Sequence, residues 1–192
     1  HKLNASQGAA HFLGQIKQLT ETPLNVLVIN FIDILSHART ESRMVRELAS
    51  NEAAYRSITL SWFRHTAIKQ LFTKLAEMDY EILITTDHGS IRVDAPIKVV
   101  GDRNVNTNLR YKLGKNLGYN AREVFEMKDP RRFGLPSPNL STAYIYAQGS
   151  RFFAYPNNYN YYAQYYRNTF QHGGISMEEM LIPLVCLKPK KR

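Results

Sequence analysis

The sequence has very little cysteine and no long apolar run. Cys186 is its single cysteine, which excludes both an internal disulfide framework and a structural zinc site built from cysteines. No apolar stretch approaches the roughly 20 residues that a membrane-spanning helix needs. The 192 residues are 44% hydrophobic and 21% charged, a composition typical of a globular domain with one substantial core. We therefore expect a cytoplasmic protein with no membrane insertion.

The net charge of +9 would suit a nucleic-acid partner, but its distribution weakens that interpretation. Four of the positive charges lie in residues 188–192, and without them the chain carries +5. A basic end of this kind is typical of a solvated tail. We therefore interpret residues 188–192 as a basic tail rather than as a binding surface.

The beginning of the chain differs from the rest. It starts at His1 and carries no signal-peptide pattern, and residues 1–23 are polar, as in a helical or linker segment. The first convincing strand begins only at Val26. We therefore expect residues 24–187 to be the later, incomplete portion of a larger domain.

Short apolar runs and a long helical pattern alternate in the first half. Residues 26–32 and 81–87 are β-branched runs too short for helix interiors, and the pattern between Thr40 and Met78 is helical with a break near Asn51. A strand, a helix and a second strand predict a βαβ unit with parallel strands. The predicted fold class is therefore α/β.

The second half is less regular, because glycines and prolines interrupt it. We predict loops over 95–140, with short helices near 108–117 and 120–126. The later expected elements are a strand at 142–147, a hairpin partner at 151–155, a weak helical segment at 159–170 and a last apolar strand at 181–187.

Aspartate and histidine recur where the predicted strands end. Asp33 and His37 follow the first strand, Asp87 and His88 follow the second, and His172 precedes two glycines and the last strand. Because parallel strands present their carboxyl ends at one edge of a sheet, these side chains are expected to converge. Carboxylate and imidazole suit zinc, and manganese as well. The plain alternative for each histidine is a hydrogen-bonded structural role.

The motif order resembles a known superfamily. Asp33…His37, Thr86-Asp87-His88-Gly89 and the run from His172-Gly173-Gly174 to Pro183 are similar to the metal-ligand order of alkaline phosphatases. The last run resembles the PglZ branch in particular, and within it the effector domain of PorX-type response regulators of the type IX secretion system. The resemblance extends over roughly residues 24–187 and implies a mostly parallel sheet flanked by helices.

The resemblance also implies a two-zinc site. Asp33, His37 and His172 would hold one ion, and Asp87 with His88 would contribute to the other. Two adjacent metals stabilise the attacking and leaving oxygens of a displacement at phosphorus. The family's remaining aspartate and its threonine or serine nucleophile come from strands upstream of the first motif, and no position of this sequence matches them. We therefore expect this chain by itself to be inactive.

A tyrosine-rich segment suggests where a substrate would bind. Eight of the twelve tyrosines lie between Tyr144 and Tyr166, with arginines interleaved. Aromatic faces beside arginines can stack bases and hold phosphates, so Arg151, Tyr155 and Tyr159 are candidate substrate contacts. The alternative is that these tyrosines only pack.

The function predicted from these features is that of a metal-dependent phosphodiesterase effector domain. The resemblance implies a phosphodiester or oligonucleotide substrate, cyclic or linear, together with an N-terminal receiver domain and a sensor kinase or secretion regulators as partners. A homodimer is left open. The alternatives are a non-catalytic regulatory domain that binds zinc and a nucleotide, and a phosphomonoesterase or phosphomutase on the same scaffold.

Overall fold

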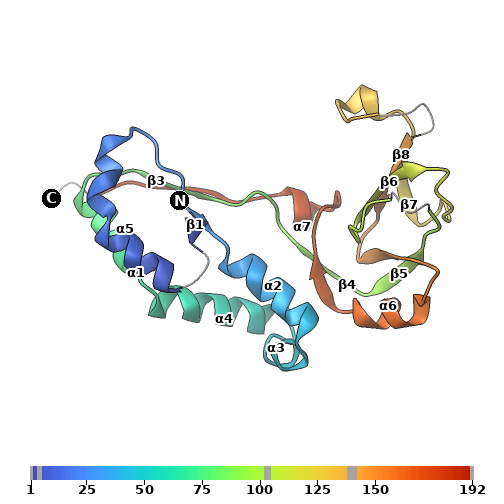
Figure 1. Cartoon of the computed structure of the whole chain (residues 1–192), viewed down its shortest axis with the longest axis horizontal. Coiled ribbons are helices and arrows are strands. Elements are labelled where there is room, and N and C mark those ends of the chain that lie inside the picture. The colour runs from blue at the N-terminus through green and yellow to red at the C-terminus, as the bar shows by residue number, and fades with distance from the viewer. Residues whose placement is uncertain (1, 4–5, 102–104, 138–141, 191–192) are drawn as a thin grey trace. The chain divides into compact units, whose positions relative to one another are not determined.

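The computed structural model describes residues 2–3, 6–101, 105–137 and 142–190, so Lys191 and Arg192 of the predicted basic tail lie outside the described residues. The chain divides into two compact units (Figure 1). Unit 1 comprises residues 1–84 and 184–192, and unit 2 comprises residues 85–183.

Unit 1 is mainly helical. Its helices are α1 (Ser6–Gly14), a 3-10 turn η1 (Ile16–Glu21), α2 (Phe31–Glu41), α3 (Arg43–Leu48), α4 (Glu52–His65) and α5 (Ile68–Glu77). Its strands form two small sheets, in which β1 (Lys2–Leu3) pairs in parallel with β2 (Val28–Ile29), and β3 (Ile82–Thr85) pairs with β11 (Leu184–Leu187).

The helical pattern between residues 40 and 78 is confirmed, including the break near Asn51. The side chain of Asn51 accepts a hydrogen bond from the Ala54 amide at 2.9 Å and caps the start of α4. The pattern is interrupted again after His65, where α4 ends and α5 begins at Ile68. On α5, an apolar stripe of Ile68, Leu71 and Leu75 packs in the core of this unit with Phe12 and Ile16. The spacing of three and four residues therefore marks the buried face of α5.

The first apolar run behaves differently from its prediction. Only Val28–Ile29 forms a strand, and helix α2 begins at Phe31, inside the predicted strand. In the described residues the pairing of β2 with β1 comprises Lys2 opposite Val28 and Leu3 opposite Ile29. Since β2 pairs with β1 and β3 pairs with β11, the two strands of the predicted βαβ unit belong to separate small sheets.

Unit 2 is mainly β-structure. Its strands are β4 (Ile91–Val93), β5 (Ala95–Lys98), β6 (Tyr111–Lys115), β7 (Val124–Met127), β8 (Thr142–Ala147), β9 (Arg151–Ala154) and β10 (Thr169–Gln171), and its helical segments are η2 (Pro130–Phe133), α6 (Tyr159–Tyr165) and α7 (Met177–Met180). β6, β8 and β7 form an antiparallel sheet, β5 pairs in parallel with β9, and β10 pairs antiparallel with β4.

Three local predictions in this unit were wrong. The segments expected as short helices near 108–117 and 120–126 contain strands β6 and β7, which pair with the two edges of β8. The segment 151–155, expected as a hairpin partner of β8, pairs with β5 instead. In each case a partner distant in sequence decides the conformation, because a strand of four or five residues carries little local signal.

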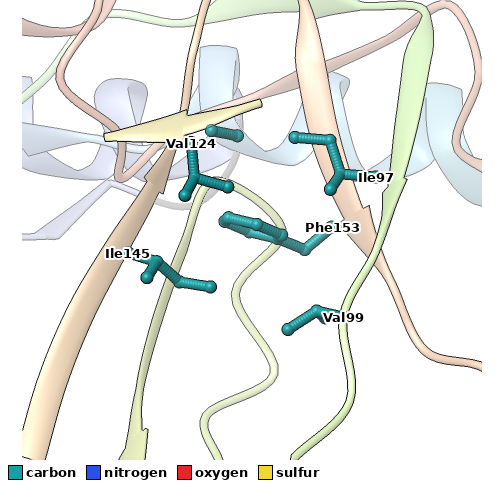
Figure 2. Close-up of a cluster of buried hydrophobic side chains, with 6 residues drawn as sticks. Ile97, Val99, Val124, Ile145 and Phe153 are labelled. Carbon is teal, nitrogen blue, oxygen red and sulfur yellow. The ribbon is translucent and has the colours of Figure 1, made fainter. Parts of the chain in front are cut away.

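The core of unit 2 forms where its sheets face each other. Figure 2 shows Ile97, Val99, Val124, Ile145 and Phe153 converging, and each of these residues is at most 5% exposed. Burying each such side chain contributes roughly 1.5–3 kcal/mol. This core fixes β9, the strand that begins with the candidate substrate contact Arg151 and directly precedes Tyr155.

The described residues thus form a mixed α/β fold built from small sheets, two of them parallel. Within this part of the chain, no helix combines the length and the apolar character required to cross a membrane.

Candidate metal centre

Asp33 and His37 lie on one face of α2. Asp33 occupies the first turn of the helix, and its Oδ1 lies 3.5 Å from Nε2 of His37, one turn later. Their side chains are 52% and 67% exposed, so both are accessible to a ligand. The i, i+4 spacing accounts for the contact.

Contacts with α4 hold the start of α2 in place. The ring of Phe31 stacks on Trp62 with centroids 4.3 Å apart, and the hydroxyl of Tyr55 donates to the carbonyl oxygen of Ile32 at 2.9 Å. Burial raises the pKa of Tyr55, which keeps this hydroxyl protonated and able to donate. The backbone immediately before Asp33 is therefore anchored by two contacts.

His88 and His172 come together in unit 2. Their imidazole rings stack with centroids 3.9 Å apart and planes 10° from parallel. His88 follows β3, whereas His172 follows β10, so the fold joins two distant segments at this point. Asp87 is more exposed, and its Oδ1 lies 3.8 Å from Nε2 of His88.

Hydrogen bonds orient the ring of His88. Its Nδ1 lies 2.9 Å from the carbonyl oxygen of Gly89, and because a carbonyl only accepts, the proton of the neutral ring resides on Nδ1. Nε2 then carries the lone pair, as in a metal-binding histidine whose other nitrogen is held by an acceptor. The hydroxyl of Thr86 donates to the His88 carbonyl at 3.0 Å and fixes the adjoining backbone.

Asn108 holds the backbone at His172. Its Nδ2 donates to the His172 carbonyl at 3.2 Å. The next residue, Gly173, has a φ of 98°, and a Cβ there would lie 2.6 Å from Nδ2 of Asn108. Glycine is therefore required after His172 both by conformation and by space.

The three candidate substrate contacts follow one another along β9 and α6. Arg151 begins β9 and is partly exposed. The hydroxyl of Tyr155 accepts from Nζ of Lys112 at 3.2 Å and donates to the Asn106 carbonyl at 3.0 Å. The hydroxyl of Tyr159 donates to the Pro96 carbonyl at 3.3 Å. Both tyrosine hydroxyls are thus bonded to the body of unit 2.

Of the adjacent Glu178 and Glu179, only Glu179 is buried. It is the third residue of α7, and its carboxylate accepts from the amide of Ser176 at 3.1 Å, as expected for an acidic residue at a helix N-terminus. Its ion-pair partner, Arg110, was missed by sequence reasoning. The two residues are far apart in the chain, and no periodic pattern or motif connects them.

A comparison with protein families agrees with the resemblance to the PglZ branch. The model of the BREX system PglZ alkaline phosphatase-like domain matches residues 7–187. The chain belongs to the PglZ family. At a coarse level, this makes it an alkaline phosphatase-like domain of the phosphoester hydrolase class. A search of curated proteins found no match.

The donor types in this PglZ domain fit zinc or manganese. They are carboxylate oxygens and imidazole nitrogens, and the hydrogen bond at Nδ1 of His88 leaves Nε2 as the nitrogen that could bind a metal ion. Within each unit, however, the described residues bring together no group of three or more His, Cys, Asp or Glu side chains that could hold a metal ion. Asp33 with His37, and His88 with His172, are each pairs of donors, fewer than the three or four protein ligands of a zinc site.

Proposed function

We propose that this PglZ domain belongs to a metal-dependent phosphodiesterase that hydrolyses phosphodiesters such as cyclic or linear oligonucleotides, using two zinc ions. The observation that carries the proposal is the stacked pair of His88 and His172. Two imidazoles from distant segments, with an aspartate beside one of them, are the donor types that a hydrolytic zinc site requires.

Asp33, His37, Asp87, His88 and His172 would hold the metal ions. When bound, two such ions neutralise charge on a phosphoester and lower the pKa of a coordinated oxygen nucleophile. Residues of the chain itself orient the two histidines. The carbonyl oxygen of Gly89 accepts from Nδ1 of His88, and the side chain of Asn108 donates to the backbone carbonyl of His172.

No nucleophile is assigned within this chain. The hydroxyl of Thr85 donates to the Pro183 carbonyl at 2.9 Å, and that of Thr86 donates to the His88 carbonyl. Both hydroxyls next to the histidine motif therefore serve the backbone. We therefore propose neither hydroxyl as the nucleophile, and we propose that this chain alone is inactive.

The motif resemblance extends the proposal to a cellular setting. We place the domain in a cytoplasmic response regulator of the PorX type, with an N-terminal receiver domain, which acts in type IX secretion under a sensor kinase. The match to the BREX-type PglZ model supports the domain, whereas the regulator rests on the motif resemblance alone.

The test is hydrolysis of bis(p-nitrophenyl) phosphate by the full-length protein after metal removal and zinc reloading. His172→Ala and His88→Ala should each lower the rate of hydrolysis by more than the roughly 10- to 100-fold that follows from loss of an outer-shell partner. His65→Ala is the matched control, because His65 is exposed and bonded only locally, to Ser61 on its own helix. Undiminished turnover in His172→Ala would contradict the metal assignment.

A second candidate is a regulatory domain that binds zinc and a nucleotide without hydrolysis. The hydroxyls of Thr85 and Thr86, which both donate to backbone carbonyls, favour it. Stoichiometric zinc, measured by elemental analysis, with no turnover of a diester or monoester would select this candidate over the enzyme.

A further inference from the structure

We infer that the buried ion pair of Arg110 and Glu179, together with Asn108, positions the two imidazoles of His88 and His172. All three are positioning residues, because none of them is itself a proposed metal ligand. The inference deepens the proposed function, since the histidines that it concerns are the proposed ligands, but the positioning itself can be measured without metal.

Glu179 accepts four hydrogen bonds with its two carboxylate oxygens. Nε and Nη2 of Arg110 donate at 3.0 and 2.9 Å, the amide of Gly174 at 2.9 Å and the amide of Ser176 at 3.1 Å. The Arg110 and Glu179 side chains are 0% and 1% exposed. One buried carboxylate therefore fixes the chain on the C-terminal side of His172.

The backbone of Glu179 holds the other histidine loop. Its carbonyl oxygen accepts from the amide of Gly89, the residue after His88, at 2.9 Å. A Cβ on Gly89 would collide with the carbonyl oxygen of Glu178. The loops that carry His88 and His172 are thus tied to the same turn of α7, one through backbone and the other through the carboxylate.

Glycine at 174 allows the second loop to approach the ion pair. A Cβ there would lie 2.6 Å from Oε2 of Glu179 and 3.1 Å from Nε of Arg110. Both positions of Gly173-Gly174 are therefore shaped by polar partners, Asn108 at the first and Glu179 at the second. The His-Gly-Gly run of the sequence acquires a physical reason from these contacts.

Arg110 is also held by contacts other than those with Glu179. Its Nη1 donates to the Arg151 carbonyl, and its backbone carbonyl accepts from the Ala147 amide at 2.9 Å. The carboxamide oxygen of Asn108 accepts from the Arg110 amide at 2.7 Å. Arg110 and Asn108 are thereby fixed to β8 and β9, whose side chains form the core shown in Figure 2.

Stability alone is a poor reason for this ion pair. Replacing a buried ion pair by apolar residues is often neutral or stabilising, because desolvation offsets the attraction, whereas charged groups can specify one geometry. Here each group that Glu179 bonds belongs to a histidine loop, to α7 or to the arginine that anchors them. The bonding pattern therefore matches a positioning role.

The first experiment reads the two imidazoles without metal. Full-length protein labelled with 13Cε1-histidine is compared with Glu179→Gln and Asn108→Asp, and the signals are assigned with His88→Ala and His172→Ala. Glu179→Gln replaces the carboxylate by an amide, whose NH2 group cannot accept the hydrogen bonds that Arg110 and the backbone amides donate. Asn108→Asp removes the N–H group that donates to the His172 carbonyl. Glu178→Gln is the control, because it makes the same charge change on the exposed neighbour.

We expect both positioning variants to lose the mutual ring-current shifts of His88 and His172, while Glu178→Gln keeps them. Spectra are recorded well below each unfolding midpoint, so that a general loss of stability does not move this readout. If Glu179→Gln does not fold, Asn108→Asp decides the outcome. Unchanged imidazole shifts in the folded variants would overturn the inference.

The second experiment titrates zinc alone into the same proteins. Affinity should fall about 10- to 100-fold in Glu179→Gln and Asn108→Asp, the usual cost of an outer-shell change, and stay unchanged in Glu178→Gln. If the unmodified protein binds no zinc, the proposed function fails while the imidazole shifts still decide the positioning. If zinc binds but neither variant alters affinity or shifts, only the positioning role fails.

Discussion

The two units bury their apolar strands very differently. In unit 2, Ile145, Phe152 and Phe153 on β8 and β9 are fully buried. In unit 1, Leu83 on β3 and Leu184 on β11 are 67% and 73% exposed, although their strands are just as apolar. An apolar run therefore predicts a strand, but its burial depends on whether the described fold supplies layers on both faces.

The difference in burial between the units affects how firmly the candidate metal donors are held. Unit 2 encloses its polar anchors, Arg110 and Glu179, in a packed interior, so the stacked histidines rest on a fixed base. In unit 1, the side chains of Asp33 and His37 are 52% and 67% exposed. Their helix is held by the Phe31 ring stack, by the Tyr55 hydrogen bond and, near its end, by the buried Arg39 side chain, but none of these contacts involves the two donors themselves. We therefore expect the two donor pairs to differ in how firmly the protein orders them.

The largest expected effect is loss of the unit 2 core. Phe153→Ala removes a fully buried ring, which typically costs about 3–5 kcal/mol of the free energy of unfolding. Trp62, the single tryptophan, lies in unit 1, so its fluorescence reports that unit, while near-UV circular dichroism of the tyrosines reports mostly unit 2. The tyrosine transition should shift to lower urea concentration and the tryptophan transition should shift much less. Equal shifts of both would show that the units unfold as one.

How far the sequence predicted the fold follows from the range of the interactions involved. The apolar stripe of Ile68, Leu71 and Leu75 was readable because a helix repeats its contacts every three to four residues. Strands β6 and β7 were misread as helices because their partner β8 lies far along the chain. Local patterns predict local structure, and pairing between distant segments escapes them.

The same reasoning applies to the candidate site. The Asp and His motifs stand out in the sequence because each is local, and the structure places His88 against His172. The ligand roles of these residues remain predictions. Arg110 could not be found in advance, because nothing near it in sequence indicates a buried partner at Glu179, and only the folded chain joins the two.

A change in the free energy of unfolding of intermediate size is expected when the pH is lowered. Burial by itself would raise the pKa of Glu179, but the hydrogen bonds and charge of Arg110, with the amide of Gly174 and a further bond from Ser176, hold the pKa below its usual range. The folded state therefore binds fewer protons than the unfolded state, whose glutamate pKa is about 4.3. The stabilisation is complete above that pH and is lost as the pH falls through the lowered pKa.

Urea unfolding followed by tyrosine circular dichroism between pH 7 and pH 3 measures this contribution. The unmodified protein should lose more stability over this interval than Glu179→Gln, whose side chain does not titrate. Glu178→Gln should lose as much as the unmodified protein, because Glu178 is exposed. An identical pH dependence in Glu179→Gln would mean that the carboxylate is not held in its charged form.

The smallest expected effect is at the exposed strands of unit 1. Leu184→Ala removes a side chain that is 73% exposed, and such changes usually alter the free energy of unfolding by less than about 0.5 kcal/mol. Leu71→Ala, in the same unit but fully buried, should cost about 2–5 kcal/mol in the same tryptophan measurement. A cost for Leu184→Ala close to that of Leu71→Ala in the full-length protein, but not in the 192-residue chain, would show that further protein covers β11. The contrast between the units would then reflect which layers are present, and not how apolar their strands are.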